Sequence, residues 1–259
     1  MALEIKPLKE GHAVKYRQPK NDIIPRVPFR GLCLAPSGSG KTLAIVNMLT
    51  RPEFYGAGLL SHVYWCSPTA TIDPALDALR DYVKTLDQVQ DEDPTFHDSV
   101  DVEFLQARVN RHRKVNEHLK KSKSRQHGYA MAIVIDDLSD VKRGLPQVAR
   151  FVDSLFVKAR HWGCCVILSS QKLKLPLISP TVRVNITFAL IFRLRSNQDL
   201  LDGFEYEYSA IVDKETLHAM YIASVSKPFG FLYLNLLEQD RNKIFHNGFS
   251  SRFIIDESK

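Results

Sequence analysis

The sequence predicts an α/β fold with a mainly parallel central sheet flanked by helices. Short, almost continuous apolar runs, such as residues 129–135, have the composition of strands that are buried on both faces. These runs alternate with segments whose apolar residues recur at helical spacing, as in 146–161. The length of 259 residues suits one large α/β domain, or such a domain with an insertion.

The first predicted elements surround two apolar runs. Residues 1–28 are polar and contain several prolines, so we expect an N-terminal arm or strand that leads into the core. Residues 29–34 are predicted to form the first core strand, and a helix over 41–49 follows. The second strand is expected at 61–67, where Pro68 ends it.

Residues 73–126 form the longest stretch without a predicted strand. We expect two or three helices there, as an insertion within a single domain of residues 1–259. The first part is acidic, and basic residues dominate from Arg108 to Arg125, with Glu117 as the single acid. Two interpretations stay open: a contact surface for phosphate backbones, or a solvated helix that pairs with the acidic segment before it.

The remaining predicted elements continue the alternation of strands and helices. In the helix at 146–161, Val148, Val152 and Leu155 recur at the spacing of one helical face. Besides 129–135, strands are expected at 164–169, 186–192, 231–237 and 243–246.

The composition is that of an ordinary globular protein, with 44% hydrophobic and 25% charged residues. The N-terminus lacks the apolar segment of a secretory signal, and no apolar run approaches the roughly 20 residues that span a bilayer. The four cysteines lie in strand-like runs, which predicts buried free thiols in a reducing compartment rather than a zinc site. The net charge of +6 and the pI of about 9.1 mildly favour a polyanionic partner.

Residues 35–42 read Ala-Pro-Ser-Gly-Ser-Gly-Lys-Thr and come directly after the first strand. Such a loop can direct its N–H groups at phosphate oxygens, and the N-terminus of the next helix adds positive potential. We expect Lys41 to reach the β- and γ-phosphates of ATP and Thr42 to hold Mg²⁺. The usual pattern G-x-x-x-x-G-K-[ST] begins with glycine, and Ala35 replaces it here. The predicted nucleotide-binding residues are Ser37, Gly38, Ser39, Gly40, Lys41 and Thr42.

Polar side chains stand at the ends of two later strands. The strand at 129–135 ends in Asp136 and Asp137, and the carboxyl end of a buried strand lies at the ligand edge of an open α/β sheet. Asp136 is the candidate Mg²⁺ ligand, through water, and Asp137 is the candidate for orienting or deprotonating the attacking water. Gln171 follows the strand at 164–169 and is a candidate sensor of the γ-phosphate. Such a sensor is typical of ATPases in which an additional strand separates the P-loop strand from the Asp-bearing strand.

Two arginines are candidates for stabilising a transferred phosphoryl group, a role that a neighbouring subunit often fills. Arg160 lies at the end of the predicted helix 146–161, and Arg183 lies just before the strand at 186–192. A structural ion pair or a DNA contact stays open as another interpretation of each arginine.

Several of these segments together resemble the poxvirus-type genome-packaging ATPases of large DNA viruses and virophages. These ATPases belong to the FtsK–HerA superfamily of additional-strand P-loop proteins. The matching segments fall within residues 29–193 and are 35–42, Ile-Asp-Asp-Leu at 135–138, Arg160-His161, Ser170-Gln171 and Arg183-Val184-Asn185.

The resemblance implies a RecA-like P-loop core that hydrolyses ATP with Mg²⁺. It further implies a homo-oligomeric ring, a pentamer or hexamer, that moves double-stranded DNA into a capsid, with portal or vertex proteins as partners. The expected location is the virion or the viral factory of the host cell. By the same resemblance, Lys41 and Thr42 bind phosphate and Mg²⁺, Asp136 and Asp137 form the acidic pair, and Gln171 is the sensor.

Two other functions stay open. A P-loop kinase of a nucleoside or small molecule would yield a phosphorylated acceptor, although Gln171 on an additional strand argues against it. A nucleotide-binding assembly switch would hold ATP without productive turnover. The short side chain of Asp137, where most hydrolysing relatives have Glu, favours the switch.

Overall fold

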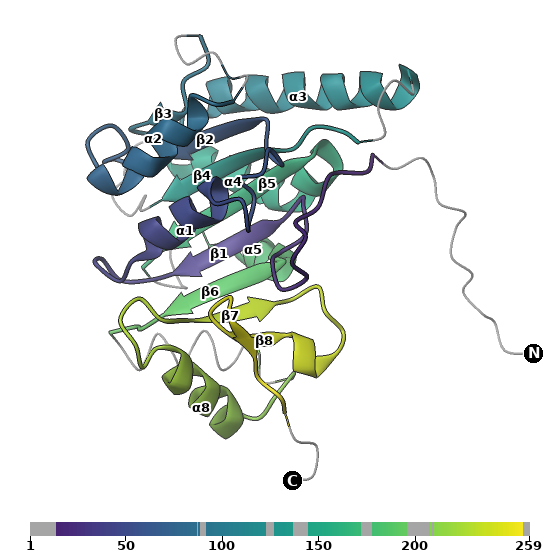
Figure 1. Ribbon diagram of the computed structural model, residues 1–259. Helices are drawn as coiled ribbons and strands as arrows, with labels where there is room; N and C mark the ends of the chain where they lie inside the picture. Colours follow the sequence, from purple (N-terminus) through teal and green to yellow (C-terminus); the bar gives the residue numbers. More distant parts are fainter. Residues whose placement is uncertain are drawn as a thin grey trace, which may run out of the picture.

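The structure is a computed structural model that describes residues 14–86, 88, 92–122, 127–136, 145–171, 178–195, 208 and 210–255. These residues form one sheet with helices on both of its faces (Figure 1). The strands are β1 (Arg30–Leu34), β2 (His62–Cys66), β3 (Phe96–His97), β4 (Met131–Asp136), β5 (Cys164–Ser170), β6 (Phe188–Phe192), β7 (Phe231–Asn235), β8 (Phe245–Asn247) and β9 (Ser251–Arg252). The helices are α1 (Lys41–Thr50), α2 (Asp77–Val83), α3 (Val102–Ser122), α4 (Leu145–Trp162), α5 (Pro180–Asn185) and α8 (Lys214–Ser224), with 3₁₀ turns η1 (Pro74–Leu76) and η3 (Arg241–Lys243).

The strands follow one another across the sheet in the order β3-β2-β4-β5-β1-β6-β7-β8-β9. The pairings from β3 to β6 are parallel, and those from β6 to β9 are antiparallel. The predicted mainly parallel sheet is confirmed. Strand β5 lies between β1 and β4, which is the place expected for the additional strand. Because these three strands are parallel, their carboxyl ends meet at one edge of the sheet.

Two apolar layers, one on each face of the sheet, hold the helices. Helices α3, α4, α5 and α8 pack on one face, and α1, α2 and the chain before β1 pack on the other. In α4, Val152, Leu155 and Ala159 are fully buried at helical spacing, as the amphipathic pattern predicts. Helix α4 extends the predicted helix 146–161 by one residue at each end.

Each predicted strand corresponds to an observed strand whose ends differ by at most two residues. The sequence pattern predicts none of α5, α8, β3 and β9. Three of these four elements are short, so they offer too few residues for a periodic pattern to show.

The chain before β1 crosses one face of the sheet, and two of its attachments to the rest of the fold are hydrogen bonds from tyrosine hydroxyls. The hydroxyl of Tyr55, which follows α1, donates to the carbonyl of Pro25 over 2.7 Å. The hydroxyl of Tyr233, on β7, donates to the carbonyl of Ile23 over 2.7 Å. This arm therefore links the parallel half of the sheet to the antiparallel half. Residues 1–13 of the predicted arm lie outside the described residues.

The predicted insertion at 73–126 contains helices and also one strand. The turn η1 and the helices α2 and α3 are helical, whereas β3 pairs in parallel with β2 at the edge of the sheet. The expectation of a stretch without strands was wrong here. A strand of two residues is held by its partner strand and leaves no periodic pattern in the sequence.

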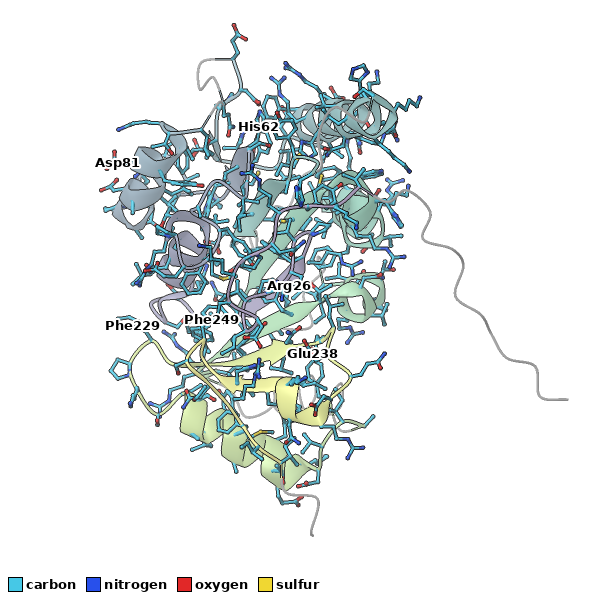
Figure 2. The ribbon with its side chains drawn as sticks, turned by 45° about the vertical axis from the view of Figure 1, so that its right-hand side comes forward. Arg26, His62, Asp81, Phe229, Glu238 and Phe249 are labelled. Atoms are coloured by element: carbon cyan, nitrogen blue, oxygen red, sulfur yellow. The ribbon has the colours of Figure 1, made fainter. Side chains whose placement is uncertain are left out.

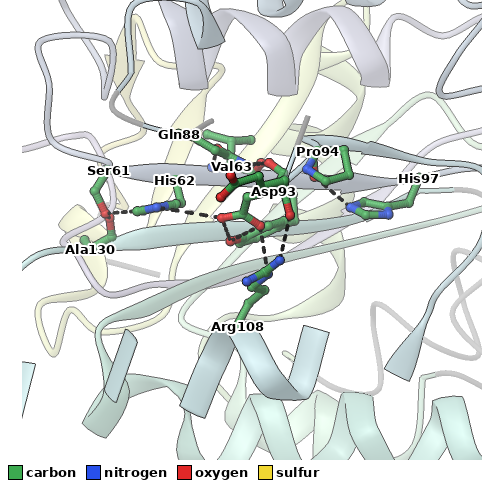
Figure 3. A network of polar contacts seen from close by, with 11 residues as sticks. Ser61, His62, Val63, Gln88, Asp93, Pro94, His97, Arg108 and Ala130 are labelled. Carbon is green, nitrogen blue, oxygen red and sulfur yellow. Dashed lines mark hydrogen bonds and ion pairs between the residues drawn. The ribbon is translucent and has the colours of Figure 1, made fainter. Parts of the chain in front are cut away.

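The acidic and basic parts of the insertion meet at Asp93, which Figure 3 shows in detail. The hydroxyl of Tyr64 donates to this carboxylate over 2.9 Å, and Arg108 Nε lies 2.9 Å from its Oδ1. Arg108 also donates to the carbonyl of Glu92 over 2.8 Å. The start of α3 therefore pairs with the acidic segment, as one of the two interpretations expected. Basic side chains with exposed positions further along α3 are Arg111, Lys114, Lys120 and Lys121.

The stability of the fold is expected to fall between about pH 6.5 and pH 4 because of His112. His112 lies on the buried side of α3, with its ring Nε2 at 3.2 Å from Asn116 Nδ2. Burial, and to a smaller extent the charge of His62, lower the pKa of His112 from 6.5 to about 4. Within this window the unfolded chain binds a proton that the folded protein does not. Above pH 6.5, His112 therefore leaves the free energy of unfolding unchanged. As the pH falls below that value, the free energy of unfolding decreases, by about 3 kcal/mol at most.

Urea unfolding at pH 7 and pH 4.5 measures this effect in the wild type and in His112→Gln, whose amide can accept from Asn116 but does not titrate. The wild type should lose more free energy of unfolding between the two pH values than the variant. Burial also lowers the pKa of His246, but that contribution is present in both proteins and cancels. Equal losses in the two proteins would contradict the role of His112.

All four cysteines are buried, as predicted: Cys33, Cys66, Cys164 and Cys165. Burial raises the pKa of the Cys66 thiol to about 12, so this thiol stays protonated at neutral pH. Within the described ranges, no helix combines the length and the apolar character needed to cross a bilayer.

Candidate nucleotide-binding site

The loop between β1 and α1 takes a shape that its glycines permit. Gly38 and Gly40 have φ angles of 79° and 90°, in the left-handed region that side chains disfavour. Ala35, at the position of the first glycine in the usual pattern, lies outside this region and is fully buried. Its N–H donates to the carbonyl of Ser170 over 3.0 Å. Alanine is therefore compatible with the backbone at this point.

The N-terminus of α1 opens onto this loop. Gly40 is the N-cap residue and has no side chain that could cap the first turn. The first N–H groups of α1 can therefore donate to an anion at the mouth of the loop. The hydroxyl of Ser39 donates to the carbonyl of Pro36 over 2.7 Å, which ties the loop to itself. Ser37 and Gly38 form its exposed tip.

The centre of the site is a buried ion pair between Lys41 and Asp136. Lys41 Nζ lies 2.6 Å from Asp136 Oδ1, and the two side chains are only 9% and 5% exposed. The hydroxyl of Thr42 donates to the other carboxylate oxygen, Oδ2, over 3.3 Å. The fold thus joins the start of α1 to the end of β4, across 95 residues of sequence. The carboxylate of Asp136 and the hydroxyl of Thr42 are hard oxygen donors of the kind that Mg²⁺ prefers, so these two residues fit that ion.

Gln171 follows β5 directly and is half-buried. In the sheet, Ser170 pairs with Leu34 of β1, and Ser169 pairs with Asp136 of β4. Gln171 is therefore placed between the ends of the strand that leads into the loop and the strand that carries Asp136. Asp137 lies outside the described residues.

The two candidate arginines lie at the opposite edge of the sheet. Arg30, the first residue of β1, donates to the carbonyl of Phe156 in α4 over 3.1 Å. Burial, and to a smaller extent the charge of the neighbouring Arg160, lower the pKa of Arg30. Arg160 therefore lies near the start of β1, whereas the loop follows its end. Arg183, in α5, precedes the start of β6, which is parallel to β1.

A cleft of about 590 Å³ opens beside the loop, on the side of strand β6. Its walls are loop residues 36–39, the chain after β6 with Arg193 and Arg195, and the segment between α8 and β7 with Phe229. Arg195 Nη2 lies 3.5 Å from the carbonyl of Ser37. None of these arginines was among the predicted site residues, although their place after a strand beside β1 is a usable signal. No sequence pattern marks Phe229.

No protein-family model and no curated protein sequence matches this chain. Solved structures do match it in three dimensions. The pCW3 conjugation coupling protein TcpA, solved with ATPγS, superposes with a TM-score of 0.50 at 12% identity, over 78% of this chain and 64% of TcpA. EssC (ATPases 2 and 3) from Geobacillus thermodenitrificans gives a TM-score of 0.54 at 11% identity, over 89% of this chain and 46% of the other. The genome packaging NTPase B204 from Sulfolobus turreted icosahedral virus 2, with AMPPCP, gives 0.48 at 16% identity, over 82% and 95%.

This chain thus spans less than two thirds of the TcpA and EssC chains that it matches. The likeness to these two ATPase structures shows the fold. With the strand order described above, it confirms the predicted P-loop α/β architecture.

Proposed function

We propose that this protein is an ATP-hydrolysing motor that translocates double-stranded DNA into a viral capsid. The observation that carries the proposal is the buried cluster of Lys41, Thr42 and Asp136 at the carboxyl edge of the sheet. Gln171, directly after the additional strand β5, adds a polar group at the same edge. The resemblance of these motifs to packaging ATPases supports the choice of DNA as substrate.

Each residue of the site has its own role in nucleotide binding or hydrolysis. Lys41 would leave Asp136 and bind the β- and γ-phosphates of ATP, Thr42 would hold Mg²⁺, and Asp136 would hold it through water. When bound, the ion neutralises charge that develops on the phosphoryl oxygens. Gln171 positions the attacking water, and Asp137 accepts its proton. The ATPγS in the structure of TcpA supports ATP as the ligand of this fold.

A homo-oligomeric ring, a pentamer or hexamer, belongs to the proposal because the candidate arginines are far from the site in their own subunit. A strand of five residues spans roughly 16 Å, and Arg160 and Arg183 lie beyond the amino ends of such strands. An arginine that stabilises the transferred phosphoryl group would then come from a neighbouring subunit.

The proposed DNA contacts include α3. Its exposed residues Arg111, Lys114 and Lys121 recur at intervals of three and seven positions, so they follow one side of the helix. A row of cations with this spacing suits a phosphate backbone, and the net charge of +6 favours the same partner. The proposal also includes capsid portal or vertex proteins as partners, and a location in the virion or the viral factory.

The proposal predicts Mg²⁺-dependent release of phosphate that rises with double-stranded DNA, from particles with the mass of a ring. Phosphate release and particle mass, each with and without DNA, test this directly. Phosphate that appears on an acceptor molecule would indicate a kinase, and ATP that stays bound for many minutes in a single turnover would indicate a switch. Absence of ATPase activity under every DNA and oligomer condition would contradict the motor.

A further inference from the structure

We infer that Phe229, on the segment between α8 and β7, forms a stacking platform for the nucleobase of the bound nucleotide. The inference rests on the proposed function, because it assigns the part of the same cleft that the phosphate-binding residues leave unused. Figure 2 shows Phe229 on its loop at the margin of the molecule.

Phe229 combines two unusual properties. It is 64% exposed although it is a large aromatic residue. Its φ angle of 60° lies in the left-handed region, and no other residue with a side chain has a positive φ in the described part of the chain. A bulky residue in this conformation persists only where its surroundings fix it, and such positions cluster at ligand sites.

The surroundings of Phe229 do fix it. The N–H of Gly230 donates to the carbonyl of Lys227 over 3.1 Å, and this turn closes the segment. Val225 is buried before the turn, and Phe231 packs on Phe192 after it, with ring centroids 5.0 Å apart. The segment is therefore anchored at both ends and presents its aromatic ring between them.

The ring lies against the phosphate-binding loop. A Cβ atom built on Gly40 would come within 2.5 Å of Phe229 Cδ1, so the ring occupies the space that a side chain at residue 40 would need. Residues 36–39 of the loop and Phe229 then line one continuous cleft. A ligand whose phosphates sit on the loop can reach the ring without leaving the cleft.

The order of strands decides which part of the nucleotide reaches Phe229. Asp136 and Gln171 follow β4 and β5, which lie on one side of β1 and mark the γ-phosphate end. The chain after β6 and the segment before β7 lie on the other side. A triphosphate that ends near Asp136 therefore directs its nucleoside toward Phe229.

The chemistry of this wall suits a nucleoside. Phe229 and Pro228 offer flat apolar surface for a base, and aromatic stacking tolerates any base because every base has a π face. Arg193 and Arg195 line another wall of the same cleft and carry the positive charge that suits the phosphate next to the ribose. The volume of about 590 Å³ lies within the range of small-molecule sites.

Calorimetric titration of ATP and of inorganic tripolyphosphate into the full chain tests the inference. Phe229→Gly removes the ring. Because glycine accepts the positive φ of this position, we expect the variant to fold. We expect this variant to bind ATP about tenfold more weakly and tripolyphosphate unchanged, whereas Phe229→Trp should retain the affinity for ATP. The control is Leu237→Ala, which removes another exposed apolar side chain, outside the cleft, and should change neither affinity.

Three results would overturn the platform: unchanged ATP binding in Phe229→Gly, tighter ATP binding because the ring blocks the cleft, or an equal loss for ATP and tripolyphosphate. If the wild type binds tripolyphosphate as tightly as ATP, the platform fails while the phosphate site of the proposed function stands. If the wild type binds neither ligand, the proposed function and the platform are both refuted.

Discussion

Replacement of Lys41 by methionine is expected to abolish ATP hydrolysis and also to lower the free energy of unfolding by about 3–5 kcal/mol. The loss of activity follows from the loss of the cation that binds the β- and γ-phosphates. The loss of stability follows from the buried pair, because the side chain of Asp136, which is only 5% exposed, loses its cationic partner. Phosphate release and urea unfolding, measured on the same preparation, report the two effects.

The double variant Lys41→Met/Asp136→Asn separates the two effects of Lys41. Its buried carboxylate is replaced by a neutral amide of nearly the same shape, so most of the lost stability should return while hydrolysis stays absent. If Lys41→Met is as stable as the wild type, the ion pair has no role in stability. If it still turns over ATP, the assignment of the phosphate-binding lysine is wrong.

Asp136→Asn alone is expected to reduce hydrolysis on the order of 10³-fold. A bound metal contributes several kcal/mol to the stabilisation of charge in the transition state, and each 1.36 kcal/mol corresponds to a factor of ten. An amide with no charge holds Mg²⁺ poorly, while Lys41 and the N–H groups of the loop remain to bind phosphate. Binding of ATP without Mg²⁺ should therefore change little. Steady-state kinetics over a series of Mg²⁺ concentrations measures the expected loss of hydrolysis.

The matched control is Asp81→Asn, on the exposed surface of α2, where the carboxylate pairs with the neighbouring Lys84. This variant should keep wild-type hydrolysis and wild-type dependence on Mg²⁺. If Asp136→Asn retains more than a tenth of the activity at every Mg²⁺ concentration, Asp136 does not hold the ion.

The parts of the site that could be predicted are those in which a short segment carries its own chemistry. The loop at 35–42 and the pair Asp136-Asp137 follow apolar runs, and parallel strands place both ends at one edge. The position of Gln171 at the end of an additional strand could likewise be expected from the order of the segments. In these cases, local pattern and sheet topology lead to the same arrangement.

Other parts depend on contacts that no local pattern encodes. Arg160 and Arg183 are near strands in the sequence, but they lie at the starts of strands rather than at the ends. Strand β3 exists because β2 offers an edge, and Phe229 takes a positive φ because the chain on both sides of it is anchored. Each of these features is set by tertiary packing.

The N-terminal arm has a mechanical consequence for the fold. A single stretch of backbone, from Ile23 to Pro25, accepts hydrogen bonds from Tyr55 and Tyr233. Tyr55 follows the helix that begins at Lys41, and Tyr233 lies on the strand that follows the segment of Phe229. This stretch therefore connects the segment after α1 directly to β7, so a displacement of the arm would reach both elements at once.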